Sequence, residues 1–194
     1  HMDTAVRAGK QEKPVSGLEV WSKTIGVIGT GRIGKGVVQR AAGFNMNILA
    51  NDAYPDRAFL ERFGGQYVDL DRIYREADFI TIHAPLTDTT KNMINERALS
   101  MMKPTAVLIN AARGGIVDEA ALYTALKEHW IYGAALDATE IEPACGSPLA
   151  LLDNCILTPH AGAATREASL KMGLLAAQNV IDVLQGKKCQ YTVN

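Results

Sequence analysis

The sequence predicts an α/β fold built on a doubly wound parallel sheet. From Lys23 onward, short apolar segments alternate with helical patterns, and the first apolar segment, residues 24–28, runs directly into three closely spaced glycines. Such an alternation places helices over both faces of a parallel sheet. Ligands of these folds bind beyond the carboxyl ends of the strands, so we expect the chemistry in the residues that follow each strand.

The first three strands are expected where apolar residues form short runs that end at turn residues. These strands cover residues 24–28, 47–50 and 67–68. Helical periodicity predicts helices over residues 32–44, 55–63 and 70–76. Gly64-Gly65 is expected to end the second of these helices, because glycine is the usual residue just past a helix.

The second half of the chain continues the same alternation. Strands are expected over residues 79–83, 106–110, 134–137 and 155–157. Helices are expected over residues 95–101, 119–128 and 165–185, and loops over residues 85–90 and 141–148. The last helix carries one apolar stripe stepping by four and three residues, made of Leu170, Leu174, Ala177, Ile181 and Leu184.

Composition excludes several classes of protein. The chain has 194 residues, of which 47% are hydrophobic, and a net charge of −1 with interspersed charges. We therefore expect a folded protein that binds neither nucleic acid nor a membrane surface. No apolar run reaches membrane-spanning length, and no signal peptide opens the sequence. The three cysteines, Cys145, Cys155 and Cys189, form neither a disulfide framework nor a metal site, so we expect a cytoplasmic protein without a metal.

The glycines that follow the first strand are spaced G-x-G-x-x-G. Gly29 permits a tight turn, Gly31 leaves the backbone open to a pyrophosphate, and Gly34 lets the helix pack closely. The start of the helix offers N–H groups and a positive dipole end to phosphates. The motif predicts a Rossmann-type dinucleotide site, with a chance glycine turn as the alternative.

An acidic residue follows the second predicted strand. Asp52 lies 18 residues after Gly34, where a carboxylate can accept hydrogen bonds from both ribose hydroxyls and repel a 2′-phosphate. We therefore predict that the cofactor is NAD and not NADP. The alternative interpretation of Asp52 is a loop cap.

Charged side chains follow three successive strands later in the chain. Arg113 stands beside Gly114-Gly115, where it could hold an anion, and His160 could move protons near neutral pH. A carboxylate such as Glu142 would stabilise the charged imidazole and orient it. Each residue also has a simpler interpretation. Arg113 would be a surface arginine beside a helix capped by Asp118, and Glu142 and His160 would be structural loop residues. The three together favour a catalytic site.

Five ordered motifs resemble those of the D-isomer-specific 2-hydroxyacid dehydrogenases, particularly the phosphoglycerate dehydrogenase branch. They occupy residues 29–34, 83–87, 110–118, 133–137 with Glu142-Pro143, and 158–160, and the likeness covers nearly the whole chain from about Gly17. One departure is Ser22, where the family usually has glycine. Formate dehydrogenase and a thioether hydrolase that keeps NAD bound are alternative Rossmann enzymes. Glu142 disfavours formate dehydrogenase, which is expected to carry glutamine at this position.

By this resemblance, Arg113 would bind the substrate carboxylate, His160 would be the general acid–base and Glu142 its partner. Asp137 would meet the nicotinamide carboxamide and His83 would form a wall of the cofactor pocket. The residues expected to bind NAD are Gly29, Gly31, Arg32, Ile33, Gly34, Asp52, His83, Ala84, Pro85, Ala111, Ala112, Arg113, Asp137, His160 and Gly162.

The resemblance also predicts how the chain is organised. Residues 1–2 are interpreted as a tag remnant, 3–22 as a truncated helix and arm, 23–163 as the NAD-binding Rossmann domain, and 164–194 as a bridging helix and tail. The family's substrate domain has no counterpart here, so we expect a single cofactor domain that binds NAD without turnover.

The resemblance leaves the substrate open among small 2-hydroxy and 2-oxo acids. 3-Phosphoglycerate, and with it serine biosynthesis, is the first choice, and hydroxypyruvate, glyoxylate or D-lactate follow. The full-length protein is expected to be a homodimer. The alternative function is a non-catalytic, NAD-sensing module of the corepressor type.

Overall fold

The computed structural model describes residues 6–10 and 17–189 of the chain. The expected tag remnant at residues 1–2 lies outside the described residues, as do residues 3–5 and 11–16 of the expected helix and arm. The same holds for the end of the expected tail, residues 190–194.

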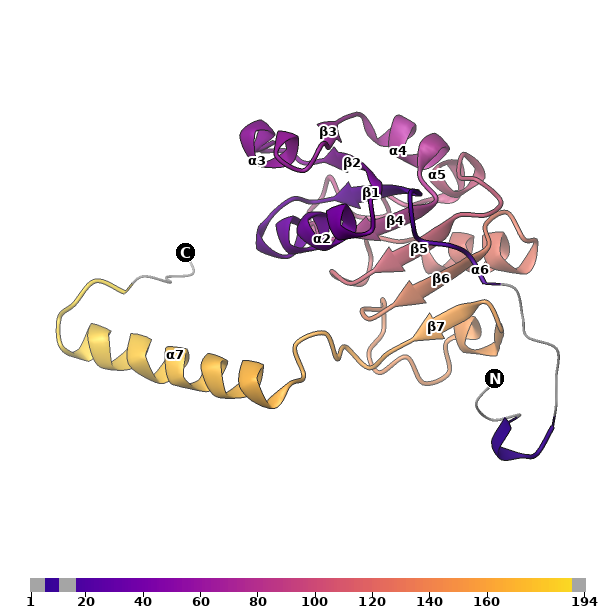
Figure 1. Cartoon of the computed structure of the whole chain (residues 1–194). Coiled ribbons are helices and arrows are strands. Elements are labelled where there is room, and N and C mark those ends of the chain that lie inside the picture. Colours follow the sequence, from indigo (N-terminus) through magenta and orange to yellow (C-terminus); the bar gives the residue numbers. More distant parts are fainter. Residues whose placement is uncertain (1–5, 11–16, 190–194) are drawn as a thin grey trace.

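A sheet of seven parallel strands forms the centre of the described molecule (Figure 1), in the order β3-β2-β1-β4-β5-β6-β7. The strand order reverses beside β1, as in a doubly wound sheet, so the predicted fold class is confirmed. The strands are β1 (Thr24–Ile28), β2 (Asn47–Asn51), β3 (Gln66–Tyr67), β4 (Phe79–Ile82), β5 (Val107–Asn110), β6 (Gly133–Leu136) and β7 (Cys155–Leu157).

Helices connect the strands at the predicted places. They are α2 (Arg32–Gly43), α3 (Arg57–Glu61), α4 (Leu70–Glu76), α5 (Glu96–Ser100), α6 (Glu119–Lys127) and α7 (Arg166–Leu184). A 3-10 turn, η1 (Pro148–Leu151), was not predicted. α3 is shorter than expected at both ends, since Asp56 caps its amino end and Arg62 is its carboxyl cap. The expected ending at Gly64-Gly65 is therefore wrong by two residues, since Gly64, with φ +68, lies that far beyond the cap. Asp118 likewise caps α6, accepting from the N–H of Ala121.

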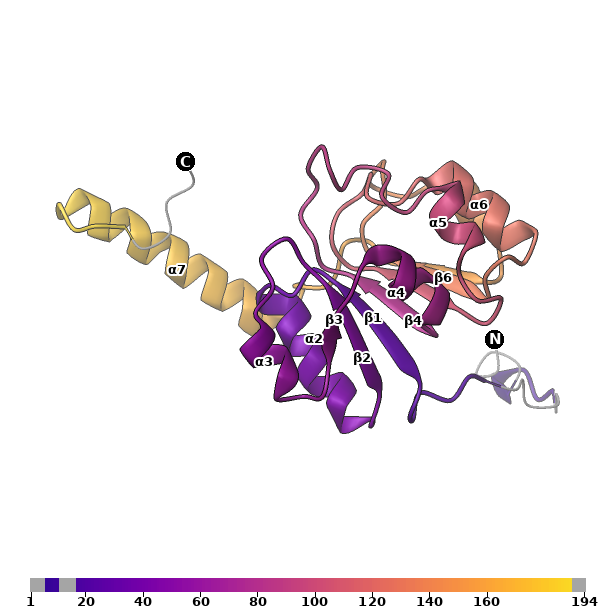
Figure 2. The same ribbon diagram turned by 90° about the horizontal axis from the view of Figure 1, so that it is seen from above.

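Helices lie on both faces of the sheet (Figure 2), and a hydrophobic cluster lies on each face. One lies beneath α4, α5 and α6 and includes the buried side chains of Ile73, Leu99 and Leu122. The other lies beneath α2 and α3 and includes Val38 and Leu60. The helices on both faces fix the strands in register and leave the carboxyl edge of the sheet open to ligands.

The register of the strands aligns the predicted site. One row crosses six strands at their carboxyl ends and consists of Asn51, Ile28, Ile82, Asn110, Leu136 and Leu157. The next residue on each strand is therefore part of one edge, although these residues are far apart in the sequence.

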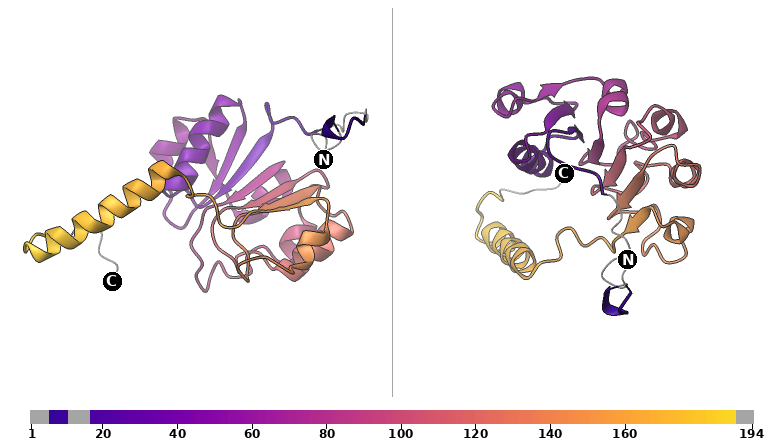
Figure 3. Two further views of the ribbon diagram at one scale, coloured as in Figure 1. Left: turned by 90° about the horizontal axis from the view of Figure 1, so that it is seen from below. Right: turned by 45° about the vertical axis from the view of Figure 1, so that its right-hand side comes forward.

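The long helix α7 extends away from the sheet (Figures 1 and 3), and none of its residues is buried. Its predicted apolar stripe is therefore exposed, with Leu174 62% and Leu184 82% accessible. Within the described part of the chain, no helix is long and apolar enough to cross a membrane.

Ser22 occupies a backbone conformation that favours glycine. Its φ is +59, and its hydroxyl accepts a hydrogen bond from the side-chain amide of Asn45 at 3.2 Å. This conformation explains why a glycine suits the position better than serine.

Candidate active site

The glycine turn between β1 and α2 has the geometry of a phosphate cradle. Gly29 has a φ of +90, and a Cβ there would lie 2.6 Å from the backbone nitrogen of Ala84. A Cβ on Gly34 would collide with the carbonyl oxygen of Gly29, whereas one on Gly31 would meet open space. No side chain caps the amino end of α2, so the first N–H groups of this helix can face an anion. The turn therefore fits a pyrophosphate.

A cavity of about 650 Å³ lies beside this turn, at the carboxyl ends of β1, β2 and β4. Gly29, Gly31, Asp52, Ala84 and Pro85, all predicted to bind cofactor, line it. Its size and largely apolar lining suit an adenosine, and Asp52 places a carboxylate on its wall.

Asp52 is anchored by three donors. Its Oδ2 accepts from the N–H of Thr30 at 2.5 Å and from the Thr30 hydroxyl at 3.0 Å, and its Oδ1 accepts from the N–H of Tyr54 at 2.8 Å. Burial alone would raise the pKa of Asp52, but these hydrogen bonds and the charge of Lys35 lower it below its ordinary value. Asp52 therefore caps its loop, as the alternative interpretation holds, and the same ionised group also lines the cavity.

His83 lies between the adenosine cavity and a second cavity of about 560 Å³. Its Nε2 is 2.9 Å from the hydroxyl of Thr81, and Nδ1 is buried without a hydrogen-bond partner among the described residues. Burial lowers the pKa of His83, so its imidazole is neutral at pH 7. It lines both cavities, and its role as a wall of the cofactor pocket stays a prediction.

The second cavity is lined at its far end by the loop after β5. Ala111, Ala112 and Arg113 line it together with Ile33 and His83. The guanidinium of Arg113 is exposed and donates from Nη1 to the carbonyl of Ala112 at 2.7 Å, which leaves its other N–H groups able to meet an anion.

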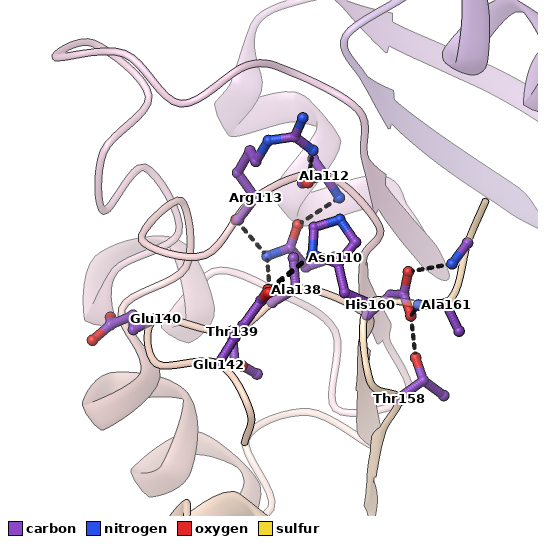
Figure 4. A network of polar contacts seen from close by, with 12 residues as sticks. Asn110, Ala112, Arg113, Ala138, Thr139, Glu140, Glu142, Thr158, His160 and Ala161 are labelled. Atoms are coloured by element: carbon purple, nitrogen blue, oxygen red, sulfur yellow. Dashed lines mark hydrogen bonds and ion pairs between the residues drawn. The ribbon is translucent and has the colours of Figure 1, made fainter. Parts of the chain in front are cut away.

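Asn110 joins the arginine loop to the next strand (Figure 4). This residue is buried, and its side-chain amide donates to the carbonyl of Arg113 at 2.9 Å and to that of Ala138 at 3.3 Å. Its Oδ1 accepts from the N–H of Ala112 at 3.1 Å. Asn110 begins one of the five sequence motifs, but the sequence alone assigns it no role.

The predicted acid–base pair forms beyond β6 and β7. Nδ1 of His160 lies 3.0 Å and 3.1 Å from the two carboxylate oxygens of Glu142 (Figure 4), beside a cavity of about 310 Å³. Both side chains are nearly half exposed. Because Nδ1 faces the carboxylate, Nε2 is the nitrogen that remains for a substrate.

Asp137 fixes the turn that carries His160. Its Oδ1 accepts from the hydroxyl of Thr158 at 2.5 Å and from the N–H of Ala161 at 2.8 Å, and its Oδ2 accepts from the N–H of Gly162 at 2.8 Å. The hydrogen bond from Thr158 is the main cause that lowers the pKa of Asp137, so it stays ionised. His160 has a φ of +52, a conformation that costs a non-glycine residue roughly 1–2 kcal/mol and that this turn holds in place.

The structure thus gathers the predicted residues along one edge of the sheet. The glycine turn, Asp52, His83, the arginine loop and the His160–Glu142 pair all follow the aligned strand ends. Sequence reasoning missed the residues that hold them, namely Thr30, Tyr67, Asn110 and Thr158. Their only sequence signal is a position next to a predicted strand end or motif.

Comparison with protein families gives a match over most of the chain. The family described as "D-isomer specific 2-hydroxyacid dehydrogenase, NAD binding domain" matches residues 1–162.

Characterised relatives are longer than this chain. It is 46% identical over 183 residues to D-3-phosphoglycerate dehydrogenase of Methanocaldococcus jannaschii, covering 94% of this chain and 35% of the relative. It is 47% identical over 171 residues to glyoxylate reductase of Pyrococcus furiosus, covering 88% and 51% respectively. The chain therefore spans about a third to a half of the length of these relatives.

Solved structures share the whole described fold. D-lactate dehydrogenase with NAD⁺ from Lactobacillus jensenii superposes with a TM-score of 0.87 and 32% identity, covering 100% of this chain and 62% of that one.

Proposed function

The chain belongs to the D-isomer specific 2-hydroxyacid dehydrogenase family as its NAD-binding domain, and from that premise we propose that the whole protein oxidises or reduces a small 2-hydroxy or 2-oxo acid. The observation that carries the proposal is the shared edge on which the glycine turn, Arg113 and the His160–Glu142 pair lie. A dinucleotide lying along this edge would bring its reactive end to the arginine and the histidine.

The cofactor would supply the hydride acceptor or donor, at C4 of its nicotinamide. In oxidation, Nε2 of His160 would take the hydroxyl proton of the substrate while the C2–H bond breaks; in reduction it would return that proton to the oxygen. Glu142, on Nδ1, would stabilise the imidazolium that forms. The base is therefore positioned by a carboxylate that need not itself change protonation.

Arg113 would bind the substrate carboxylate through its planar, always charged guanidinium. The same charge would stabilise the negative charge that develops on the substrate oxygen. Its loop borders the cavity next to His83, which supports a substrate position between the arginine and the cofactor.

Among substrates, we propose 3-phosphoglycerate first, which would place the protein in serine biosynthesis. Glyoxylate is a close second choice, since relatives of similar identity are named for each substrate. Hydroxypyruvate and D-lactate also fit a site that recognises only a carboxylate and an adjacent oxygen. Contacts that distinguish these acids would come from the part of the protein outside this chain.

For the chain by itself, we propose NAD binding without turnover, because His160 and Glu142 stay nearly half exposed and no second wall covers them in the described residues. The whole protein is proposed to be a cytoplasmic homodimer, its unpaired cysteines fitting a reducing compartment. A non-catalytic NAD-sensing module receives no support from the relatives named above, which carry the names of dehydrogenases or reductases.

The test is a His160→Asn variant of the full-length protein. Asparagine tolerates the positive φ at this position but cannot act as a base. We expect kcat to fall by about 10²–10⁴-fold, the usual contribution of a positioned acid–base group, while the Kd of NAD changes far less because His160 is one of many residues expected to bind NAD.

The matched control is His129→Asn, since His129 also has a positive φ, of +54, and is exposed at the other end of the sheet. This control should leave kcat unchanged. Turnover that survives His160→Asn would refute the assigned role of His160.

A further inference from the structure

We propose that Thr30 and Tyr67 are positioning residues that set the preference for NAD over NADP by fixing the Asp52 carboxylate in place. Asp56 adds to this preference by engaging Lys35, the nearby cation that could otherwise attract a 2′-phosphate. The inference rests on the proposed role of Asp52 at the adenosine ribose and extends it to residues that do not touch the cofactor.

The hydrogen bonds among these residues can point in only one direction. The backbone N–H of Asp56 can only donate, and it donates to the hydroxyl oxygen of Tyr67 at 3.1 Å. The carboxylate of Asp52 can only accept, so the Thr30 hydroxyl donates to it at 3.0 Å. Thr30 has then used its only hydroxyl hydrogen, and the 2.7 Å contact with Tyr67 must be a donation from the tyrosine.

The resulting series of hydrogen bonds runs from the Asp56 N–H through Tyr67 and Thr30 to Asp52. Each donor polarises the next, which strengthens the final bond to the carboxylate. Thr30 is 4% exposed, so water does not readily replace Tyr67 as its donor. These hydrogen bonds connect β3, the turn after β1 and the end of β2, and the three strands lie side by side in the sheet (Figure 2).

Fixing the carboxylate matters because repulsion between two anions depends on their separation. A mobile Asp52 could turn away from a 2′-phosphate. Backbone N–H groups hold one carboxylate oxygen each, and the Thr30 hydroxyl, as a second donor on Oδ2, opposes that rotation further. The three donors leave one acceptor position on this carboxylate, so Asp52 can accept from one ribose hydroxyl and not from both as the sequence predicts, and it offers a phosphate no donor.

One cation in this region, Lys35, is already paired. Nζ of Lys35 lies 2.5 Å from Oδ2 of Asp56 and 4.9 Å from the centre of the Phe59 ring. Lys35 is close enough to act on the charge of Asp52. With Asp56 as its partner, the lysine offers a phosphate less net attraction than a free ammonium would.

Calorimetric titration of this chain with NAD and with NADP tests the inference through the ratio of the two Kd values. We expect Thr30→Val to lower the NADP/NAD ratio of Kd values about tenfold, the effect of one hydrogen bond to a charged group. Tyr67→Phe should lower the ratio about threefold, and the double variant should match Thr30→Val alone, because the tyrosine acts through the threonine.

A separate variant tests the cation. Asp56→Asn keeps both the cap on α3 and the backbone N–H but removes the charge on Lys35's partner, so the Kd of NADP should fall while that of NAD is unchanged. Tyr132→Phe, at the opposite end of the sheet, is the control for loss of a tyrosine hydroxyl. A ratio unchanged by Thr30→Val, in protein that melts normally, would overturn the inference.

Asp52→Asn separates this inference from the proposed function. If Asp52→Asn leaves the ratio unchanged, the proposed role of Asp52 fails together with the inference. If Asp52→Asn lowers the ratio while Thr30→Val and Tyr67→Phe do not, Asp52 keeps its role and the positioning by Thr30 and Tyr67 is wrong.

Discussion

Asn110 shows how one buried side chain joins two parts of the candidate site. Its amide satisfies two carbonyls and one N–H, on the arginine loop and on the end of β6. The sequence placed Asn110 at a strand end, but the carbonyl of Ala138 is 28 residues away, and no local pattern signals that contact. Residues that perform chemistry carry a recognisable type, whereas residues that hold them are defined by their neighbours.

Replacing Asn110 by alanine leaves those buried backbone groups without partners. We expect the free energy of unfolding to fall by about 1–3 kcal/mol, as for other buried hydrogen-bonding groups left unsatisfied. Urea unfolding of the isolated chain measures the change.

Asn110→Asp is the informative companion. It keeps the acceptor for the Ala112 N–H but sets a carboxylate against two carbonyl oxygens, so it should destabilise the chain at least as much as alanine. An alanine variant as stable as the original chain would show that water replaces the amide.

At the scale of elements, the loop after β5 packs against the loop after β6. Glu119, the first residue of α6, and Glu140 each accept a hydrogen bond from the other's backbone N–H, at 2.6 Å and 3.3 Å. Gly114 lies against the same segment, where a Cβ would fall about 2.0 Å from the carbonyl oxygen of Thr139. This contact keeps the arginine loop beside the loop that leads to Glu142.

Gly114→Ala should therefore displace one of the two loops. We expect a loss of about 1–3 kcal/mol in the free energy of unfolding, the range for overpacking at a close contact. Chemical denaturation measures it.

Gly43→Ala, at the end of α2, is the matched control. A Cβ there meets nothing within 4 Å, so alanine should stabilise the helix by about 0.5–1 kcal/mol. Equal effects of the two substitutions would contradict the role given to the Gly114 contact.

Local sequence patterns do not determine the residues at which helices and strands end. The centres of the strands and helices were predicted from periodicity, and α4 and β7 match to the residue. β4 and β6 end one residue earlier than expected, although His83 and Asp137 still donate their backbone N–H groups to the carbonyls of Ile28 and Asn110 on the neighbouring strands. A strand ends where its partners end, and a single strand's sequence does not contain that information.

At the scale of the whole molecule, several carboxylates are held ionised. The pKa values of Asp52, Asp56, Asp71, Asp78 and Asp137 all lie below the ordinary value of 3.8. For Asp78, burial alone would raise the pKa, but hydrogen bonds from Lys103 and the Thr24 N–H outweigh burial. Below pH 3.8, the unfolded chain binds protons that the folded chain does not.

We therefore expect the free energy of unfolding to fall as the pH is lowered through 3.8 toward the lower pKa values of the folded carboxyls. Asp78→Asn keeps an acceptor for the Thr24 N–H but loses the pair with Lys103, so it should flatten this dependence. Urea unfolding at pH 5, 4 and 3 measures the slope, with the exposed Asp153→Asn as control. Equal slopes in all three proteins would contradict the contribution of Asp78.

The exposed stripe of α7 also belongs to this scale. The sequence predicted the helix and its stripe but not whether this chain buries the stripe, because amphipathicity defines a face and not its partner.

The sequence by itself determined the fold class, the dinucleotide motif and the types of the candidate catalytic residues. Periodicity, glycine spacing and ionisable side chains are local properties, so they can be read along the chain. Only the tertiary structure decided that Glu142 meets Nδ1 of His160, that Asp137 holds the histidine turn, and that Tyr67 contacts the hydroxyl of Thr30 that binds Asp52. These contacts depend on strand order and register, which arise when distant segments pack together.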